Sequence, residues 1–120
     1  MYNVKIFPTS PRVDTHFHIF ESRQSIKGAR YNPAYAATLD QWWSQAEAVG
    51  VTHGVLVQPS FLGTDNRLLL KGLAAYPGRL MGIAVVEPTI SLQEMKELHA
   101  LGVRGVRLNL VGGDHRLEHW

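Results

Sequence analysis

The chain contains no cysteine among its 120 residues, which excludes disulfide bonds, thiolate nucleophiles and thiolate metal ligands. It has no apolar run near the roughly 18 residues of a membrane-spanning helix, and its N-terminus lacks the apolar core of a signal peptide. A strong charge of either sign is also missing, because the net charge is +2 and the basic residues are scattered. We therefore expect a soluble, cytoplasmic protein with no membrane or nucleic-acid partner.

What the sequence does contain is a regular alternation of apolar and amphipathic segments. Hydrophobic residues make up 45% and charged residues 18% of the chain, as in ordinary globular domains. Strand-like segments rich in apolar residues span 12–19, 51–59, 80–87 and 103–110, the second of them nearly continuous in apolar residues, and helical patterns lie between them. This β-α-β-α-β-α-β order predicts an α/β fold with parallel strands and right-handed crossovers.

The predicted helices have recognisable ends. Capping boxes begin at Thr38 and Ser91, while Thr64 or Asp65 can cap the helix between them. Glycine at the helix ends favours termination in the left-handed conformation, at Gly50 and Gly102. Helical spacing predicts apolar stripes in the first and third helices, formed by Leu39, Trp42, Trp43, Ala46, Val49, Leu92, Met95, Leu98 and Leu101.

The first apolar run, VDTHFHIF over residues 13–20, places polar groups at every second position. Strand alternation puts Asp14, His16 and His18 on one face. The Cα atoms of the two histidines would then lie about 6.5–7 Å apart, so both imidazoles can lean toward one ion with Zn–N bonds of about 2.0–2.1 Å. The spacing alone is equally compatible with two histidines on a half-exposed strand.

Polar residues also appear where each later apolar run ends, and the carboxyl ends of parallel strands meet at one edge. Gln58 and Asn109 can bind a ligand there or can pair backbone groups as strand gives way to loop. Arg107 needs an anionic partner, because an unpaired buried charge costs several kcal/mol, and its planar fork suits a carboxylate. The long segment 21–37 has the length of a functional loop and leaves from the same edge.

Four segments in order resemble the amidohydrolase-related family, and within it the sugar-lactone and pyrone-dicarboxylate lactonases. They are VDTHFHIF (13–20), VLVQPSF with GTDN (55–66), GIAVVEP (82–88) and GVRGVRLNL (102–110). Proteins of this family are (β/α)8 TIM barrels, which typically take about 250 residues. The resemblance therefore implies that residues 1–120 form the N-terminal half of such a barrel, with its first four strands.

The resemblance also implies an activity, hydrolysis of a carboxylated cyclic ester. It gives His16 and His18 catalytic and metal-binding roles, with Zn²⁺ the expected divalent metal. It also implies a metal-independent alternative, because some lactonases of this branch look to work without a metal and use the same histidines to polarise the carbonyl. It makes Arg107, in its GVRxN context, a ligand of a substrate carboxylate and leaves the number of acid groups on the substrate open. The remaining predicted substrate-binding residues are Gln58, Ser60 and Asn109.

Two alternatives stay open from the sequence. Metal-dependent decarboxylases of the related family share the N-terminal histidine motif, so decarboxylation is the nearest rival reaction. The other alternative is an inactive half-barrel that binds ligand weakly or self-associates through exposed strand edges. The motifs do not separate these possibilities.

Overall fold

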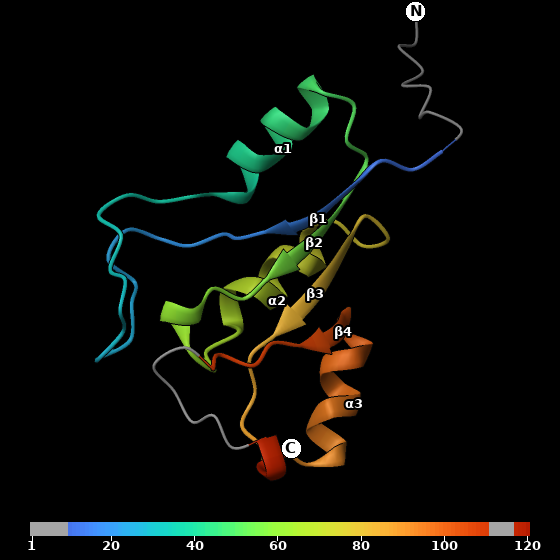
Figure 1. Ribbon diagram of the computed structural model, residues 1–120. Coiled ribbons are helices and arrows are strands. Elements are labelled where there is room, and N and C mark those ends of the chain that lie inside the picture. Colours follow the sequence, from blue (N-terminus) through green and yellow to red (C-terminus); the bar gives the residue numbers. More distant parts are fainter. Residues whose placement is uncertain (1–9, 111–116) are drawn as a thin grey trace, which may run out of the picture.

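The computed structural model describes residues 10–110 and 117–120 (Figure 1). In these ranges the elements are β1 (Val13–Phe17), α1 (Leu39–Ala48), β2 (His53–Val57), η1 (Ser60–Leu62), α2 (Arg67–Ala75), β3 (Leu80–Ala84), α3 (Leu92–Ala100), β4 (Val103–Val106) and η2 (Leu117–His119). The strands form one sheet in the order β1-β2-β3-β4, and every neighbouring pair is parallel. The predicted alternation and pairing are confirmed.

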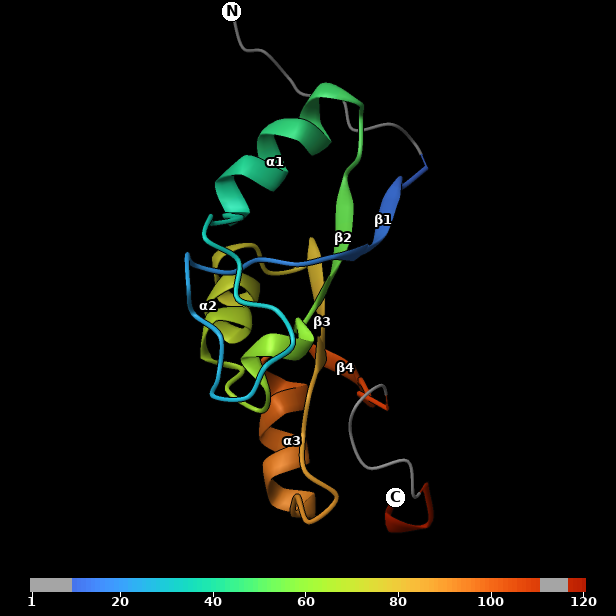
Figure 2. The same ribbon diagram turned by 60° about the vertical axis from the view of Figure 1, so that its left-hand side comes forward.

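The helices α1, α2 and α3 all lie on one side of the sheet (Figure 2). Between the two layers lies a hydrophobic core centred on β2, β3 and α2, formed by Phe17, Ile19, Trp43, Ala46, Leu56, Leu69, Leu73, Leu80, Ala84, Val86 and Val103. On the opposite face the strands present side chains that no described helix covers, and Val13 and Met81 are 48% and 55% exposed. The sheet is therefore packed on one face and open on the other.

Both predicted capping boxes are present. The hydroxyl of Thr38 accepts from the backbone N–H of Gln41, and the hydroxyl of Ser91 accepts from that of Glu94. Gly50 and Gly102 have φ values of 77° and 107°, the left-handed region in which glycine replaces other residues without strain. Local sequence thus fixes where α1 and α3 begin and end.

The predicted cap of α2 is wrong. The N-cap position is Asn66, whose own side chain makes no cap bond, although Asp65 Oδ1 accepts from the backbone N–H of Arg67 at 3.3 Å. The Asn66 side chain instead pairs with the backbone of Val85 in the next strand-to-loop junction, donating at 2.9 Å and accepting at 3.2 Å. The side chain at the N-cap position is therefore used in a long-range contact, which the sequence does not reveal.

Two predicted apolar stripes are only partly buried. Val49 is 68% exposed because it is the C-cap of α1, beyond the last turn that packs on the sheet. In α3 only Leu98 packs against the core, whereas Leu92, Met95 and Leu101 are about half exposed or more. The reason is that α3 lies at the β4 end of the sheet, where no further described element covers it.

The strands end earlier than the apolar runs predicted, with β2 ending at Val57 and β4 at Val106. Ladder bonds nevertheless continue for one residue, since Gln58 N donates to Ile83 O at 2.9 Å and Arg107 N donates to Ala84 O at 2.8 Å. The polar residues therefore stand at the point where the ladder stops. None of the helices in the described ranges is long and apolar enough to cross a membrane.

Candidate active site

The strand β1 contains a bulge that decides which way its polar residues face. Asp14 pairs with Gly54 and Phe17 pairs with Leu56, so three positions on β1 match two on β2. Asp14 therefore lies on the helix-covered side, where its Oδ2 accepts from Trp42 Nε1 at 2.8 Å. The prediction that Asp14 shares a face with the two histidines is wrong, because the extra residue breaks the alternation.

His16 and His18 converge. Their Nε2 atoms are 3.3 Å apart, and the rings are perpendicular with centroids 4.9 Å apart. His18 Nδ1 lies 2.7 Å from the carbonyl oxygen of Val57, to which it donates. Because that bond places the proton of neutral His18 on Nδ1, its Nε2 keeps a free lone pair on the side of His16.

The environment of His18 favours its neutral form. Partial burial is the largest cause that lowers its pKa from the ordinary value of 6.5. The hydrogen bond to Val57 acts in the opposite direction, while the charges of His16 and Arg107 lower the pKa further. Neutral imidazole is the form that can bind a metal or accept a proton.

The histidine pair fits a metal as two of its ligands. Two nitrogens bound tetrahedrally at about 2.0–2.1 Å from a zinc ion would be about 3.3–3.4 Å apart, which agrees with the observed separation. The same distance fits a direct hydrogen bond from His16 to His18. A catalytic zinc site needs about three protein ligands, and the described residues contain no cluster of three such side chains.

Arg107 reaches the same edge of the sheet from β4. A second bulge lies in that strand, where Gly82 pairs with Val103 but Ile83 pairs with Gly105. Val106 then pairs with buried Ala84, which puts Arg107 on the open face, as predicted from alternation. Its Nη1 donates to the backbone carbonyl of Gln58 at 3.0 Å, so the guanidinium is anchored across the end of β2.

Gln58 itself is 1% exposed, and its side chain is directed to the loop that follows β2. The Nε2 group donates to the backbone carbonyls of Gly63 at 3.0 Å and Asp65 at 2.8 Å. Through these bonds Gln58 holds the η1 segment and, through its backbone carbonyl, Arg107. Of the two roles considered for Gln58 from the sequence, ligand binding and pairing of backbone groups, the side chain has the second.

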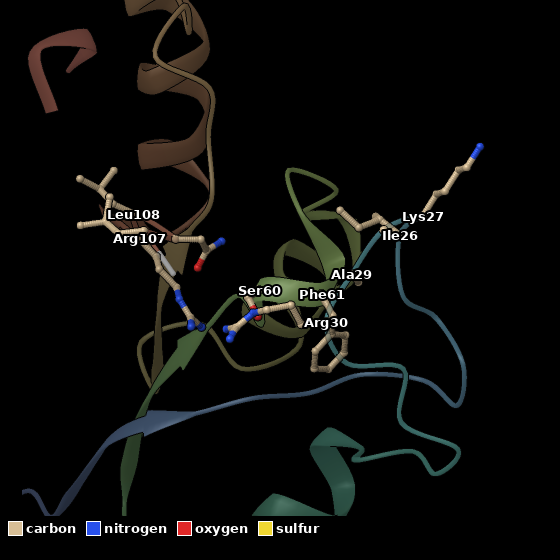
Figure 3. A pocket seen from close by; sticks show the side chains of 11 residues that line it. Ile26, Lys27, Ala29, Arg30, Ser60, Phe61, Arg107 and Leu108 are labelled. Atoms are coloured by element: carbon tan, nitrogen blue, oxygen red, sulfur yellow. The ribbon is translucent and has the colours of Figure 1, made fainter. Parts of the chain in front are cut away.

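Beside Arg107 lies a pocket of about 400 Å³ (Figure 3). Its lining comes from the β1–α1 loop, η1 and the segment after β4, and comprises Ile26, Lys27, Gly28, Ala29, Arg30, Ser60, Phe61, Arg107, Leu108, Asn109 and Leu110. The Oδ1 atom of Asn109 is buried without a hydrogen-bond partner in the described part of the chain. The volume suits a small ligand, since such sites typically measure about 300–1,000 Å³.

The structure thus brings His16, His18 and Arg107 together at the strand ends, and Ser60 and Asn109 into one pocket with Arg107. Sequence reasoning missed Arg30, which lines the same pocket. The only signal was the length of its loop, because this cation is indistinguishable in sequence from other surface charges.

The sequence profile of the amidohydrolase family matches residues 13–119, and the chain belongs to this family. Its described strands are four parallel strands of the kind that amidohydrolase TIM barrels contain. More particularly, the chain is similar to lactone hydrolases. It is 34% identical over 102 residues to a 2-pyrone-4,6-dicarboxylate hydrolase of Comamonas testosteroni. This match covers 82% of this chain and 33% of that protein.

A 4-sulfomuconolactone hydrolase of Hydrogenophaga intermedia is 30% identical over 97 residues, or 78% of this chain and 32% of that protein. Among solved structures, a probable 2-pyrone-4,6-dicarboxylic acid hydrolase of Acinetobacter baumannii, with citric acid bound, matches at a TM-score of 0.84 and 48% identity. That match covers 88% of this chain and 40% of the other. The chain spans about a third of the length of the curated relatives it matches.

Proposed function

We propose that these residues form the part of a lactone hydrolase that polarises the ester carbonyl and binds a carboxylate of the substrate. The observation that carries the proposal is the convergence of His16, His18 and Arg107 at the carboxyl ends of the strands, next to a pocket lined by cations. The relatives named for 2-pyrone-4,6-dicarboxylate and 4-sulfomuconolactone support it, since both compounds are cyclic esters that bear acid groups.

In the proposed reaction the oxygen of water bonds to the lactone carbonyl carbon, and the bond from that carbon to the ring oxygen breaks. The ring oxygen takes up a proton, and the product is the open-chain acid. His16 and His18 face the carbonyl with their Nε2 atoms, and the bond from His18 to Val57 keeps that ring oriented. The negative charge that develops on the carbonyl oxygen is stabilised by groups already held in place.

His16 and His18 would hold a divalent metal, with Zn²⁺ the ion that suits two imidazoles at this separation. When bound, such an ion supplies Lewis-acid polarisation of the carbonyl and a lower pKa for attacking water. Without a metal, His16 can donate a hydrogen bond from its Nε2 to the carbonyl oxygen, whereas the Nε2 of His18 carries a lone pair and can accept a proton.

Arg107 binds the substrate carboxylate in this proposal. Its Nη1 is anchored to Gln58, so the remaining nitrogens of the guanidinium are presented in a fixed plane that suits a carboxylate. Ser60 and Asn109 line the same pocket and offer a hydroxyl and an amide to the polar atoms of the ring. Gln58 contributes by holding Arg107 and the η1 segment in place.

Binding by the 120-residue chain tests this assignment. Isothermal titration with 2-pyrone-4,6-dicarboxylate and with uncharged 2-pyrone should show binding of the acid, and Arg107→Met should weaken that binding about tenfold or more, as expected for a lost hydrogen bond to a charged group. Arg107→Lys should also weaken it, because lysine keeps the charge but loses the planar fork. Equal effects of these variants on both ligands would remove Arg107 from the carboxylate-binding role.

The open sheet supports a second expectation, self-association of this chain. β1 and β4 are the edge strands of the described sheet, and Val13 and Met81 on its open face are 48% and 55% exposed. Exposed edges and apolar faces recruit partners. Light scattering at micromolar concentration should detect oligomers, and a lactone-hydrolysis assay with and without zinc should detect no turnover. A monomer that hydrolyses lactones would contradict this expectation.

A further inference from the structure

The loop between β1 and α1 is held against η1 by several contacts. The backbone N–H of Ile26 donates to the carbonyl oxygen of Phe61 at 2.8 Å, and the rings of Phe20 and Phe61 meet edge to face with centroids 5.1 Å apart. Within the loop, Ser25 Oγ donates to the carbonyl oxygen of Tyr31 at 2.6 Å. These contacts therefore hold the loop in place as one side of the pocket.

A tight turn in this loop lies between the side chains of Lys27 and Arg30. Ala29 N donates to Ile26 O at 3.2 Å, and Gly28 has a φ of 81°, which a turn of this kind requires at its third position. Lys27, on the outer side of the turn, points away from the pocket in Figure 3. Arg30, which follows the turn, points into it.

Arg30 and Arg107 approach the same space from two different elements. Figure 3 shows both guanidinium groups directed to the region beside Ser60, and all three residues line the pocket of about 400 Å³. None of the described residues that line this pocket is acidic. Among the residues that the structure describes, neither arginine has an ion-pair partner.

Two guanidinium groups that face one space without an acid repel each other, and the repulsion is relieved when anionic groups enter. One carboxylate satisfies the fork of one guanidinium, because the pairing is planar and bidentate. Arg107 is fixed by its bond to Gln58, so it does not swing across the pocket to share a carboxylate with Arg30. The arrangement is therefore complementary to two separate acid groups on one ligand.

We infer that Arg30 is a specificity-determining residue that binds the second acid group of a dianionic lactone whose first carboxylate lies on Arg107. This inference rests on the proposed function, because it assumes the role of Arg107 given there. The ligand class is a cyclic ester with two carboxylate or sulfonate groups at separate ring positions.

The test compares a dianion with a monoanion on the 120-residue chain. The probes are 2-pyrone-4,6-dicarboxylate and 2-pyrone-6-carboxylate, titrated calorimetrically at pH 7.5 and low salt. The wild-type chain should bind the dianion about tenfold tighter, and Arg30→Gln should remove most of that difference while changing the affinity for the monoanion less than about twofold. Arg30→Lys should lose affinity for the dianion to an intermediate extent, because the charge remains and the fork does not.

Lys27→Gln is the matched control, since it removes one positive charge from the same loop on a side chain that points away from the pocket. It should change the affinity for either probe less than about twofold. Equal weakening by Arg30→Gln and Lys27→Gln would overturn the inference in favour of a general effect of charge. Equal wild-type affinity for both probes would also overturn it and would leave the proposed function intact, whereas failure to bind either probe would overturn both.

Discussion

A histidine and an arginine lie at each end of β2, but the two pairs have different roles. At its beginning, His53 Nδ1 lies 2.7 Å from the hydroxyl of Thr52, and Arg79 Nε donates to the carbonyl oxygen of Thr52 at 2.7 Å. The Arg79 guanidinium also lies over the ring of Trp43, 4.6 Å from its centroid. Here Arg79 joins the residue before β2 to Trp43 of α1, and the bond of His53 is to its own neighbour in the chain.

At the end of β2, His18 donates to the carbonyl oxygen of Val57 and Arg107 donates to that of Gln58. These bonds use one nitrogen of each side chain and leave the others directed toward His16 or the pocket. The difference teaches that residue type does not decide the role. What distinguishes the end of β2 is that the nitrogens left over from these bonds face His16 and the pocket, which fits the placement of active sites at the carboxyl ends of parallel barrel strands.

The largest effect is expected for packing near the beginning of β2. A Cβ added at Gly54 would lie 2.6 Å from Phe17 and 2.7 Å from Trp42, whose rings are stacked with centroids 3.9 Å apart. Gly54→Ala should therefore lower the free energy of unfolding by about 2–3 kcal/mol, as overpacking does. Gly105→Ala is the control, because its Cβ meets only the flexible tip of Ile83 at 3.0 Å, and urea denaturation should give a clearly smaller loss.

The second largest expected effect is on zinc affinity, which should differ between variants at the two ends of β2. His18→Asn should weaken zinc binding to the chain by about 10- to 100-fold, because one of two converging imidazoles is lost. His53→Asn should leave the affinity unchanged, since His53 lies at the other end of β2 next to Thr52. Isothermal titration with zinc alone measures both, and an equal loss in the two variants would abolish the distinction between the ends.

A pair of arginine variants should show a smaller, reciprocal effect. Arg79→Met should cost about 1–2 kcal/mol of unfolding free energy, because it removes a hydrogen bond and a contact between a cation and an aromatic ring. Arg107→Met should cost less than that and should instead weaken binding of carboxylated pyrones. Urea denaturation measures the stability of the two variants, and calorimetric titration measures their binding of carboxylated pyrones. A larger stability loss for Arg107→Met than for Arg79→Met would contradict the structural role of Arg79 and the binding role of Arg107.

The smallest effect concerns protonation of His18. Its pKa in the folded chain lies below 6.5, so the unfolded chain binds a proton more readily. The free energy of unfolding should consequently fall as the pH drops below 6.5 toward the folded pKa, and level off below it. NMR titration of the metal-free chain measures the pKa, and most of the shift should persist in Arg107→Met because burial is its largest cause. A pKa at or above 6.5 would contradict this account.

The sequence was sufficient to predict the order of strands and helices, because periodicity and capping are local. It also predicted His16, His18 and Arg107 at one edge of the sheet, since parallel strands place their carboxyl ends together. It failed for Asp14, because a bulge is a property of two strands in register and not of one.

The same limit explains the other misses. The Asn66 side chain pairs with the backbone of Val85, nineteen positions away, and no local pattern announces such a contact. Arg30 enters the pocket only because its loop is fixed to Phe61 of a different segment. Periodicity describes neighbours along the chain, whereas these side chains are positioned by neighbours in space.

The two bulges have a consequence for how the chain tolerates change in length. The interior pairing of β2 with β3 is regular, while the edge strands β1 and β4, which supply the histidines and Arg107, each hold one extra residue. The face on which a strand residue lies depends on whether the count from the last paired position is odd or even. Loss of the extra residue Arg104, for example, would remove the bulge and keep Gly105 opposite Ile83 and Val106 opposite Ala84, so Arg107 would stay on the open face. The edge strands that supply the candidate site can therefore lose their extra residue without turning its side chains to the other face, whereas loss of one residue from the regular pairing of β2 with β3 would exchange the faces of all residues that follow.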